Sequence, residues 1–450
     1  MPRPDLRPAR RLLPFLLVAF TLLTACAPAA PSTGPAPAWS ADSPAGEIAR
    51  WMRRACRGPL ANRQCTEQNL VALVGQAGIG RAMEVLDTLM RVDAGVRTYG
   101  HELAHGMGIA AYTGPQTMHA AFAACPAGEG AGCHHGVVQG YFLDLVSQGR
   151  MPGTAELDAL CEPHRPNTFL YGQCGHGMGH GLMAVYQNHV PRTLRACDQA
   201  SDPYIRESCY SGIFMENIVL VTHPHNTTGG HGATQGRHGA DDAHAGHGDA
   251  HGGHGASADH GSVDHGTADE PWQPLDRDDP LYPCSVVGEQ YQPACYVMQT
   301  GAMLYLNGGS VTDAGHACEG APQRMMPICF GSLGRDIMAL AEMDHARSLA
   351  MCGRVARMGG GQGELWCMLG VVQNLVNLAA TADEGMRFCR LVTADGHKSE
   401  CYRAVGEQML TLLPADEQRG HACQSAEPGF VAACRMGARL ADAAREDQVR

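Results

Sequence analysis

The spacing of the cysteines constrains the fold of this chain more than any other feature. Cys26 stands alone near the N-terminus, and the other eighteen of the nineteen cysteines fall into nine close pairs. From Cys125 onward the first members recur every 34 to 37 residues, except for one step of 87 residues. That step contains a histidine-rich insertion, so the period continues across it and indicates a repeat protein. The pairs are Cys56 with Cys65, Cys125 with Cys133, Cys161 with Cys174, Cys197 with Cys209, Cys284 with Cys295, Cys318 with Cys329, Cys352 with Cys367, Cys389 with Cys401 and Cys423 with Cys434.

The paired cysteines are predicted to be disulfides rather than free thiols. So many thiols in one exported chain are typical of an oxidising compartment. No Cys-x-x-Cys occurs, which argues against thiolate zinc knuckles and haem attachment. Eighteen cysteines allow many connectivities, but local pairing is the economical choice because each pair brackets one loop. Closing such a loop stabilises a fold by about 3 kcal/mol in the chain-entropy model.

The segments between the loops favour an all-α fold. Residues 68–85, 332–349 and 364–380 carry apolar residues at helical spacing, which predicts a helix over each segment. We expect each repeat to be an αα-hairpin, with its first cysteine near the end of one helix and its second near the start of the next. The motif Cys-x-x-Gly recurs and predicts close helix packing, because glycine costs about 1 kcal/mol relative to alanine inside a helix.

The period and the cysteine pairs resemble the Sel1-like and tetratricopeptide families of helical repeat solenoids. The resemblance covers residues 46–450 and implies a solenoid stapled by local disulfides. We divide it into N-terminal repeats (46–221), a disordered insertion (222–275) and C-terminal repeats (276–450). The repeat between Cys65 and Cys125 lacks its own cysteine pair, and the register places Leu89 and Tyr99 where that pair would be.

The N-terminus predicts export. Three arginines within residues 7–11 precede an apolar run over residues 12–23, which is built like a signal peptide. The run ends in Leu-Thr-Ala-Cys at Cys26, which resembles the lipobox of bacterial lipoproteins. The resemblance implies a signal peptide (1–25), lipid on Cys26, a flexible tether (26–45) and anchoring to a membrane of the cell envelope. Ala27, in place of an aspartate, is compatible with sorting to an outer membrane, and an ordinary secretory signal is the alternative to the lipobox.

The repeat without cysteines carries a second motif. It reads His101-Glu102-Leu103-Ala104-His105, and HExxH resembles the zincin metalloprotease helix. The resemblance implies that His101 and His105 bind a metal and that Glu102 is a general base acting on a metal-bound water.

The repeats also favour a shared histidine site. Aligned by the cysteine register, His101 and His105 stand opposite His176 and His180, whereas the glutamate does not recur. Side chains from neighbouring packed helices can share one metal, and imidazoles suit zinc, copper, nickel or iron. We expect a divalent transition metal, zinc or copper. Capping of helices or hydrogen bonding to carbonyls is the alternative role for these histidines. The predicted ligands are His101, His105, His135, His176, His180 and Glu216.

Ten further histidines lie between His223 and His265, among Gly, Ala and Asp. Such a segment has too little apolar content to pack a core, which predicts a disordered loop. Histidine-rich tracts bind metal ions weakly. The loop is therefore either a metal collector or a low-complexity expansion without a role.

Three classes of function follow from the sequence. The first is a lipid-anchored, extracytoplasmic metal-binding protein that uses the histidine cluster. The second is a metal-dependent hydrolase with Glu102 or Glu216 as general base. The third is a solenoid scaffold whose groove binds another envelope protein. A net charge of −12 without a basic patch argues against nucleic acid as a partner.

Overall fold

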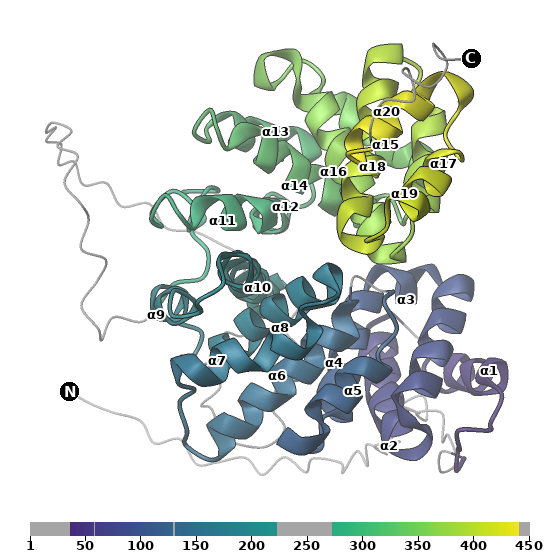
Figure 1. Cartoon of the computed structure of the whole chain (residues 1–450), viewed down its shortest axis with the longest axis vertical. Coiled ribbons are helices and arrows are strands. Elements are labelled where there is room, and N and C mark those ends of the chain that lie inside the picture. Colours follow the sequence, from purple (N-terminus) through teal and green to yellow (C-terminus); the bar gives the residue numbers. More distant parts are fainter. Residues whose placement is uncertain (1–36, 58, 129–130, 223–271, 441–450) are drawn as a thin grey trace, which may run out of the picture. The chain divides into compact units, whose positions relative to one another are not determined.

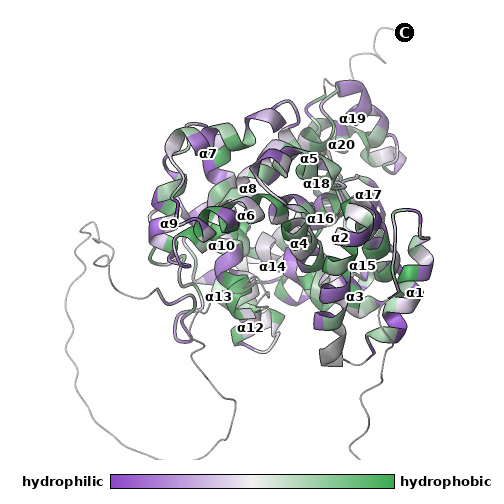
Figure 2. Ribbon diagram, turned by 90° about the horizontal axis from the view of Figure 1, so that it is seen from below, coloured by the Kyte–Doolittle hydropathy of each residue, from purple (hydrophilic) through white to green (hydrophobic). Residues whose placement is uncertain are grey.

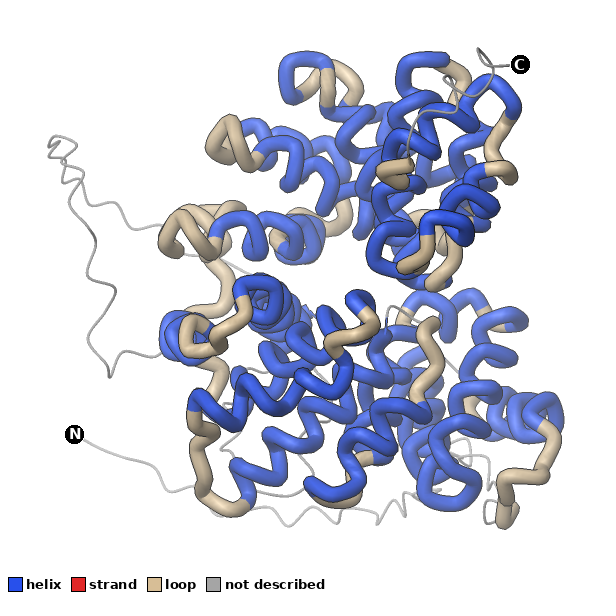
Figure 3. Tube along the Cα trace, viewed as in Figure 1, coloured by secondary structure: helices blue, strands red, loops and turns tan. Residues whose placement is uncertain are grey.

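A computed structural model describes residues 37–57, 59–128, 131–222 and 272–440. The predicted signal peptide, Cys26, most of the predicted tether and residues 223–271 of the predicted insertion lie outside these ranges. All regular structure in the described ranges is helical, which confirms the all-α fold (Figures 1 and 3). None of the described helices is both long enough and apolar enough to cross a membrane.

The helices before residue 223 are α1 (Ala45–Ala55), α2 (Pro59–Val92), α3 (Ala94–Thr98), α4 (Gly100–Ala111), α5 (Met118–Ala124), α6 (Gly132–Ser147), α7 (Thr154–Cys161), α8 (Thr168–Val185), α9 (Val190–Cys197) and α10 (Pro203–Thr222). Those after residue 271 are α11 (Gln292–Met298), α12 (Thr300–Leu306), α13 (Val311–Glu319), α14 (Met326–Leu340), α15 (His345–Cys352), α16 (Gly363–Ala379), α17 (Asp383–Leu391), α18 (Asp395–Leu412), α19 (Asp416–Cys423) and α20 (Val431–Gly437).

Short and long helices alternate from α1 to α10 and from α13 to α19, whereas α11, α12 and α20 have seven residues each. Helices α4, α6, α8 and α10 pack consecutively side by side, and α14, α16, α18 and α20 do the same. Apolar residues concentrate where the helices meet, and hydrophilic residues lie mainly on their outward faces (Figure 2). Each long helix therefore presents one face to its predecessor and another to its successor, as expected of a repeat array.

All nine predicted cysteine pairs are disulfides, which confirms local pairing. In most repeats the bond joins the end of a short helix to the first turns of the following long one. The bonds join Cys56 to Cys65, Cys125 to Cys133, Cys161 to Cys174, Cys197 to Cys209, Cys284 to Cys295, Cys318 to Cys329, Cys352 to Cys367, Cys389 to Cys401 and Cys423 to Cys434.

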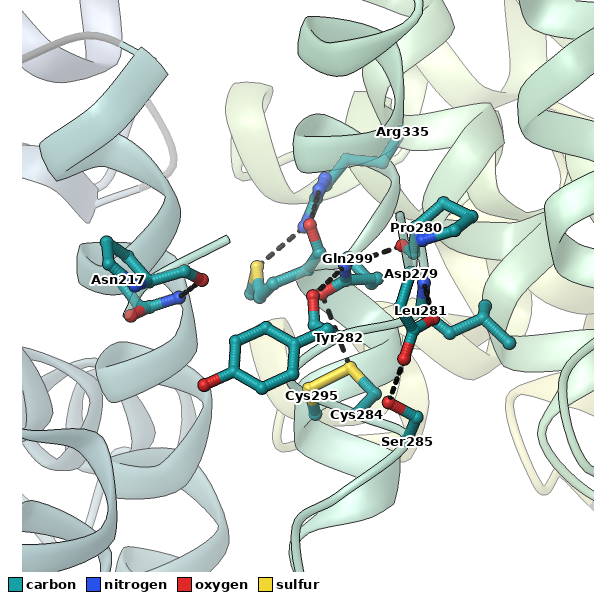
Figure 4. Close-up of a disulfide and its surroundings, with 12 residues drawn as sticks. Asn217, Asp279, Pro280, Leu281, Tyr282, Cys284, Ser285, Cys295, Gln299 and Arg335 are labelled. Atoms are coloured by element: carbon teal, nitrogen blue, oxygen red, sulfur yellow. Dashed lines mark hydrogen bonds between the residues drawn. A yellow bond between two sulfur atoms is a disulfide. The ribbon is translucent and has the colours of Figure 1, made fainter. Parts of the chain in front are cut away.

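One disulfide departs from this arrangement. The bond between Cys284 and Cys295 joins a turn to α11 (Figure 4). Gln299 fixes that turn, because its Nε2 donates to the carbonyls of Pro280 and Tyr282 at 2.8 and 2.6 Å. This repeat therefore begins with a hydrogen-bonded turn in place of a short helix.

Glycines let the long helices approach closely, as the Cys-x-x-Gly motif predicted. A Cβ atom on Gly136 in α6 would lie 1.9 Å from the carbonyl oxygen of His105 in α4. On Gly212 in α10 it would lie 2.0 Å from the carbonyl oxygen of His176 in α8. No larger residue fits at either position without separating the two helices.

These contacts correct the predicted alignment of the histidines. In three pairs of neighbouring long helices, a glycine of one helix packs against a backbone carbonyl of the other. That carbonyl belongs to the residue two positions after the cysteine of its own helix, which is His176, Gly331 or Arg403. In α4 the equivalent carbonyl belongs to His105, so Leu103 rather than Tyr99 occupies the cysteine position. His105 therefore corresponds to His176. The predicted match of His101 and His105 with His176 and His180 is wrong by four residues, about one helical turn.

Two predicted helices are interrupted. Residues 364–380 lie almost entirely within α16. Residues 68–85 lie within α2, but Gly78 has a non-helical backbone (φ 80°, ψ 162°) and kinks the helix there. Residues 332–349 span the end of α14, a turn and the start of α15. Glu342 and Met343 have positive φ values of 55° and 64°, which end the helix. Asp344 then starts α15, because its side chain accepts a hydrogen bond from the backbone N–H of Arg347 at 2.7 Å.

Candidate metal centre

Three consecutive long helices bring three histidines together. His105 on α4, His135 on α6 and His180 on α8 are each 2% exposed. Each offers a ring nitrogen, and these atoms lie within 4.8 Å of one another. We call these residues the inner triad. Their convergence follows from the close packing of α4 against α6 and of α6 against α8.

His180 is oriented by a buried carboxylate. Its Nδ1 lies 2.6 Å from Oε2 of Glu216 on α10, and both side chains are almost completely buried. Because a carboxylate only accepts, Nδ1 carries the proton and donates it. Nε2 then presents its lone pair, and this atom is buried with no hydrogen-bond partner among the described residues. A carboxylate behind a histidine is the usual arrangement at metal sites, and it makes the imidazole a stronger ligand.

His135 is oriented by an amide. Its Nε2 lies 2.7 Å from Oε1 of Gln173 on α8, so Nε2–H donates and Nδ1 presents the lone pair. Nδ1 is also buried without a hydrogen-bond partner in the described structure. The ligand atom of His135 is therefore the opposite ring nitrogen from that of His180.

His176 is oriented by a hydroxyl. Its Nδ1 lies 2.8 Å from Oγ of Ser211 on α10. That oxygen already donates its single hydrogen to the carbonyl of Ser208 at 2.8 Å, so it accepts from His176. Nε2 of His176 consequently presents a lone pair, and within the described ranges this buried atom has no hydrogen-bond partner.

Burial keeps these imidazoles neutral. Desolvation lowers the pKa of His180 to about 3 and those of His135 and His176 well below the usual 6.5. Neighbouring histidines lower each of these pKa values further, because two imidazolium ions close together repel. Neutral imidazole is the form that binds a metal, so the ligands are ready at neutral pH.

The residues of the inner triad fit a transition metal. Zinc is held by imidazoles at about 2.0 to 2.1 Å, and three histidines are a common ligand set that leaves one coordination position open. The described cysteines are all in disulfides, so the donors are nitrogen and oxygen, which suit zinc, copper or nickel.

The other predicted ligands lie around the triad. The ring of His101 lies 5.4 Å from that of His135, and the ring of His176 lies 4.5 Å from it, between ring centres. Glu216 contacts His180 rather than belonging to the group of three. Only one histidine of the HExxH motif, His105, belongs to that group.

Glu102 lies beside the cluster. Its charge contributes to raising the pKa of Glu67, whose main cause is burial. Glu102, His101, His135 and His176 all line one cavity of about 1100 Å³. The carboxylate predicted as a general base is therefore placed at the cavity wall.

Equivalent repeat positions line this cavity. Residues two or six positions after the second cysteine of a repeat include His135, His176, Ser211, Arg335 and Gln373. Side chains at these two equivalent positions of successive repeats therefore line the same cavity. In the N-terminal repeats these side chains include imidazoles, and in the C-terminal repeats they include a guanidinium and an amide.

Two supporting residues were not predicted from the sequence. Gln173 immediately precedes Cys174, and Ser211 lies two residues after Cys209. Ser211 occupies the repeat position of His135 and His176, so the cysteine register contained a signal for it. Nothing in the sequence pattern distinguishes Gln173.

Comparison of the chain with protein-family models, with curated proteins and with solved structures found no match.

Proposed function

We propose that this protein is a lipid-anchored extracytoplasmic metal-binding protein that holds one zinc or copper ion at His105, His135 and His180. The observation that carries the proposal is the buried group of three imidazoles on adjacent helices. The hydrogen bonds of His135 and His180 aim a lone pair of each ring away from its partner. Histidines that only stabilised the fold would be expected to use both ring nitrogens in hydrogen bonds.

The disulfides support the location. Nine disulfides indicate an oxidising compartment outside the cytoplasm. The lipobox-like sequence ending at Cys26 supports lipid attachment, which would hold the metal site at a membrane surface.

Elemental analysis of the full-length protein, purified without a histidine tag and dialysed against a weak chelator, tests this function. We expect about one tightly held metal ion per chain. Deletion of residues 223–271 should keep it, whereas His105→Ala and His180→Ala should lose it. His316→Ala is the control, because that side chain is 62% exposed. Wild-type protein without metal above background would refute the proposal.

A second function is favoured by the position of Glu102 on the cavity wall. The open coordination position of a three-histidine site could hold a water that a carboxylate activates, as in metal-dependent hydrolases. Glu102→Gln separates the two functions. If the protein only binds metal, the variant retains its metal and no hydrolysis of peptide or ester substrates depends on Glu102. If it is a hydrolase, the variant keeps the metal and loses turnover.

A further inference from the structure

The cavity borders the histidine cluster on one side only. Within the described residues its wall includes His101, His135 and His176, but not His105 or His180. His101 is half-buried and His176 is 8% exposed, compared with 2% for each member of the inner triad. An ion in the cavity would therefore meet His101 and His176, here called the outer pair, together with His135 of the inner triad, before it reached His105 and His180.

The outer and inner histidines have supporting partners of different strength. Ser211, a neutral hydroxyl, accepts from His176, whereas Glu216, a carboxylate, accepts from His180. A carboxylate partner makes the imidazole more basic and the metal bond stronger than a hydroxyl does. His180 is therefore a stronger metal ligand than His176, which lies nearer the cavity, about one turn away on the same helix.

The spacing between the histidines is short at every step. The ring centre of His176 lies 5.0 Å from that of His180, and the ring centre of His101 lies 6.2 Å from that of His105. His135 lies between the two groups, 5.4 Å from His101 and 4.5 Å from His176 between ring centres. An ion can therefore exchange one imidazole for the next without leaving the cluster.

We propose that His101 and His176 form a transfer site that receives a divalent metal ion from the cavity and passes it, with His135 as the shared ligand, to the inner triad. This inference rests on the proposed metal-binding function. The outer pair holds the ion only in passage, so it sets the rates of loading and release rather than the final affinity. The carboxylate of Glu102 lies on the same cavity wall as the outer pair, and so does the guanidinium of Arg335.

Kinetics of zinc exchange test the inference. Full-length protein is mixed with zinc and a chromophoric chelator, and the uptake rate, release rate and equilibrium affinity are measured for His101→Gln and His176→Gln. Loss of supporting groups at metal sites costs about 10- to 100-fold in affinity, so the transient complex should weaken and both rates should fall by a similar factor. The dissociation constant should stay unchanged, because a residue used only in passage affects both directions equally.

Three results would overturn the transfer site. A weaker equilibrium affinity with faster release would make His101 or His176 a resident ligand. A second tightly held zinc ion in the wild type, absent from the variants, would make the outer pair a storage site. Unchanged rates would place the path elsewhere.

The control for cavity shape is His345→Gln, because His345 lines the same cavity and is not part of the cluster. It should leave both rates unchanged. Failure of the proposed function looks different from failure of this inference, because wild-type protein would then bind no zinc tightly at all.

Discussion

At the scale of single residues, the site depends on which ring nitrogen each histidine leaves available. Glu216 fixes Nε2 of His180 as the ligand atom, and Gln173 fixes Nδ1 of His135. Both partners are buried or half-buried, so water competes little for these hydrogen bonds. The orientation of the metal ligands is therefore set before a metal arrives.

Replacement of Glu216 by glutamine should weaken metal binding. The amide oxygen can still accept from His180 Nδ1, but the negative charge that strengthens the imidazole is lost. We expect zinc affinity to fall about 10- to 100-fold, as measured by competition with a chelator of known affinity. Glu319→Gln is the matched control, because that carboxylate contacts an exposed histidine, His316, at 3.1 Å. Equal affinity in the Glu216 variant and the wild type would contradict the assigned role.

A second histidine contact, away from the metal centre, predicts acid sensitivity. Burial and the nearby His119 lower the pKa of His164 to about 4, and its ring stacks on Phe122 at 4.0 Å between centres. In the unfolded chain its pKa is about 6.5. Between pH 6.5 and 4 the unfolded state therefore binds a proton that the folded state does not, so stability falls as the pH is lowered through this window.

Replacement of His164 by phenylalanine should reduce that loss. Urea unfolding of metal-free protein at pH 7 and pH 4.5 should show a smaller decrease in the free energy of unfolding for the variant than for the wild type. His316→Phe is the control, since its side chain is 62% exposed. An identical decrease in His164→Phe and wild type would show that His164 does not contribute to the acid sensitivity.

At the scale of helices, the contact between a glycine and a carbonyl positions the metal ligands. Gly136 lies against the carbonyl oxygen of His105, one member of the inner triad, and Gly177 lies against the backbone of His135, another. Stability and ligand spacing therefore depend on the same contacts. Any widening of the α4/α6 interface would separate two ligands of the triad.

Replacement of Gly136 by alanine should damage both the fold and the site. The new Cβ would lie 1.9 Å from the carbonyl oxygen of His105. We expect a loss of about 1 to 3 kcal/mol in the free energy of unfolding, together with weaker zinc binding. Gly80→Ala is the control, because no atom lies within 4 Å of the added Cβ in α2; it should be neutral or stabilising.

Gly334→Ala separates the two effects. Its Cβ would lie 1.9 Å from the carbonyl oxygen of Cys367, in the C-terminal repeats. This variant should lose stability as Gly136→Ala does while keeping zinc affinity. Equal zinc affinity in Gly136→Ala and Gly334→Ala would break the link between helix spacing and the triad.

Much of the arrangement of the helices could be predicted from the sequence. Cysteine spacing was sufficient for the repeats and the disulfides, because both depend on local separation along the chain. The register of α4 was mispredicted because that repeat has no cysteines to mark it. Gly108 marks the register of α4. It packs against the carbonyl of Cys133 as Gly179 packs against the carbonyl of Cys209. Gly179 lies five residues after its own cysteine, so the cysteine position in α4 lies five residues before Gly108.

The site itself was only partly predictable. His105, His135, His180 and Glu216 were all identified as candidates, since a histidine at a repeated position predicts a shared face. Which three of the five histidines converge depends on helix separation and side-chain rotation. Sequence periodicity does not contain either quantity, so the distinction between inner and outer histidines required the structure.

At the scale of the whole molecule, disulfides within single repeats support a site that is assembled across several repeats. Each disulfide closes a loop inside one repeat, whereas the metal centre draws on α4, α6, α8 and α10. The disulfides therefore stabilise single repeats, and a bound metal would join neighbouring ones.

Binding of a metal should offset the removal of one disulfide. In Cys161→Ala/Cys174→Ala we expect a loss of about 3 kcal/mol in the chain-entropy model. Zinc at about 1,000 times its dissociation constant should restore about 4 kcal/mol by binding the folded state. Thermal unfolding with and without zinc measures both effects. If zinc fails to raise the melting temperature of this variant and of the wild type, the metal does not link the repeats.

The all-disulfide state of the described cysteines has a consequence for oxidative chemistry. Sites built on thiolates release their metal when peroxide oxidises the sulfur. Here the candidate ligands are imidazoles supported by a carboxylate, an amide and a hydroxyl, and the described sulfurs of cysteine are already oxidised. A metal at this centre would stay bound at peroxide concentrations that empty thiolate sites.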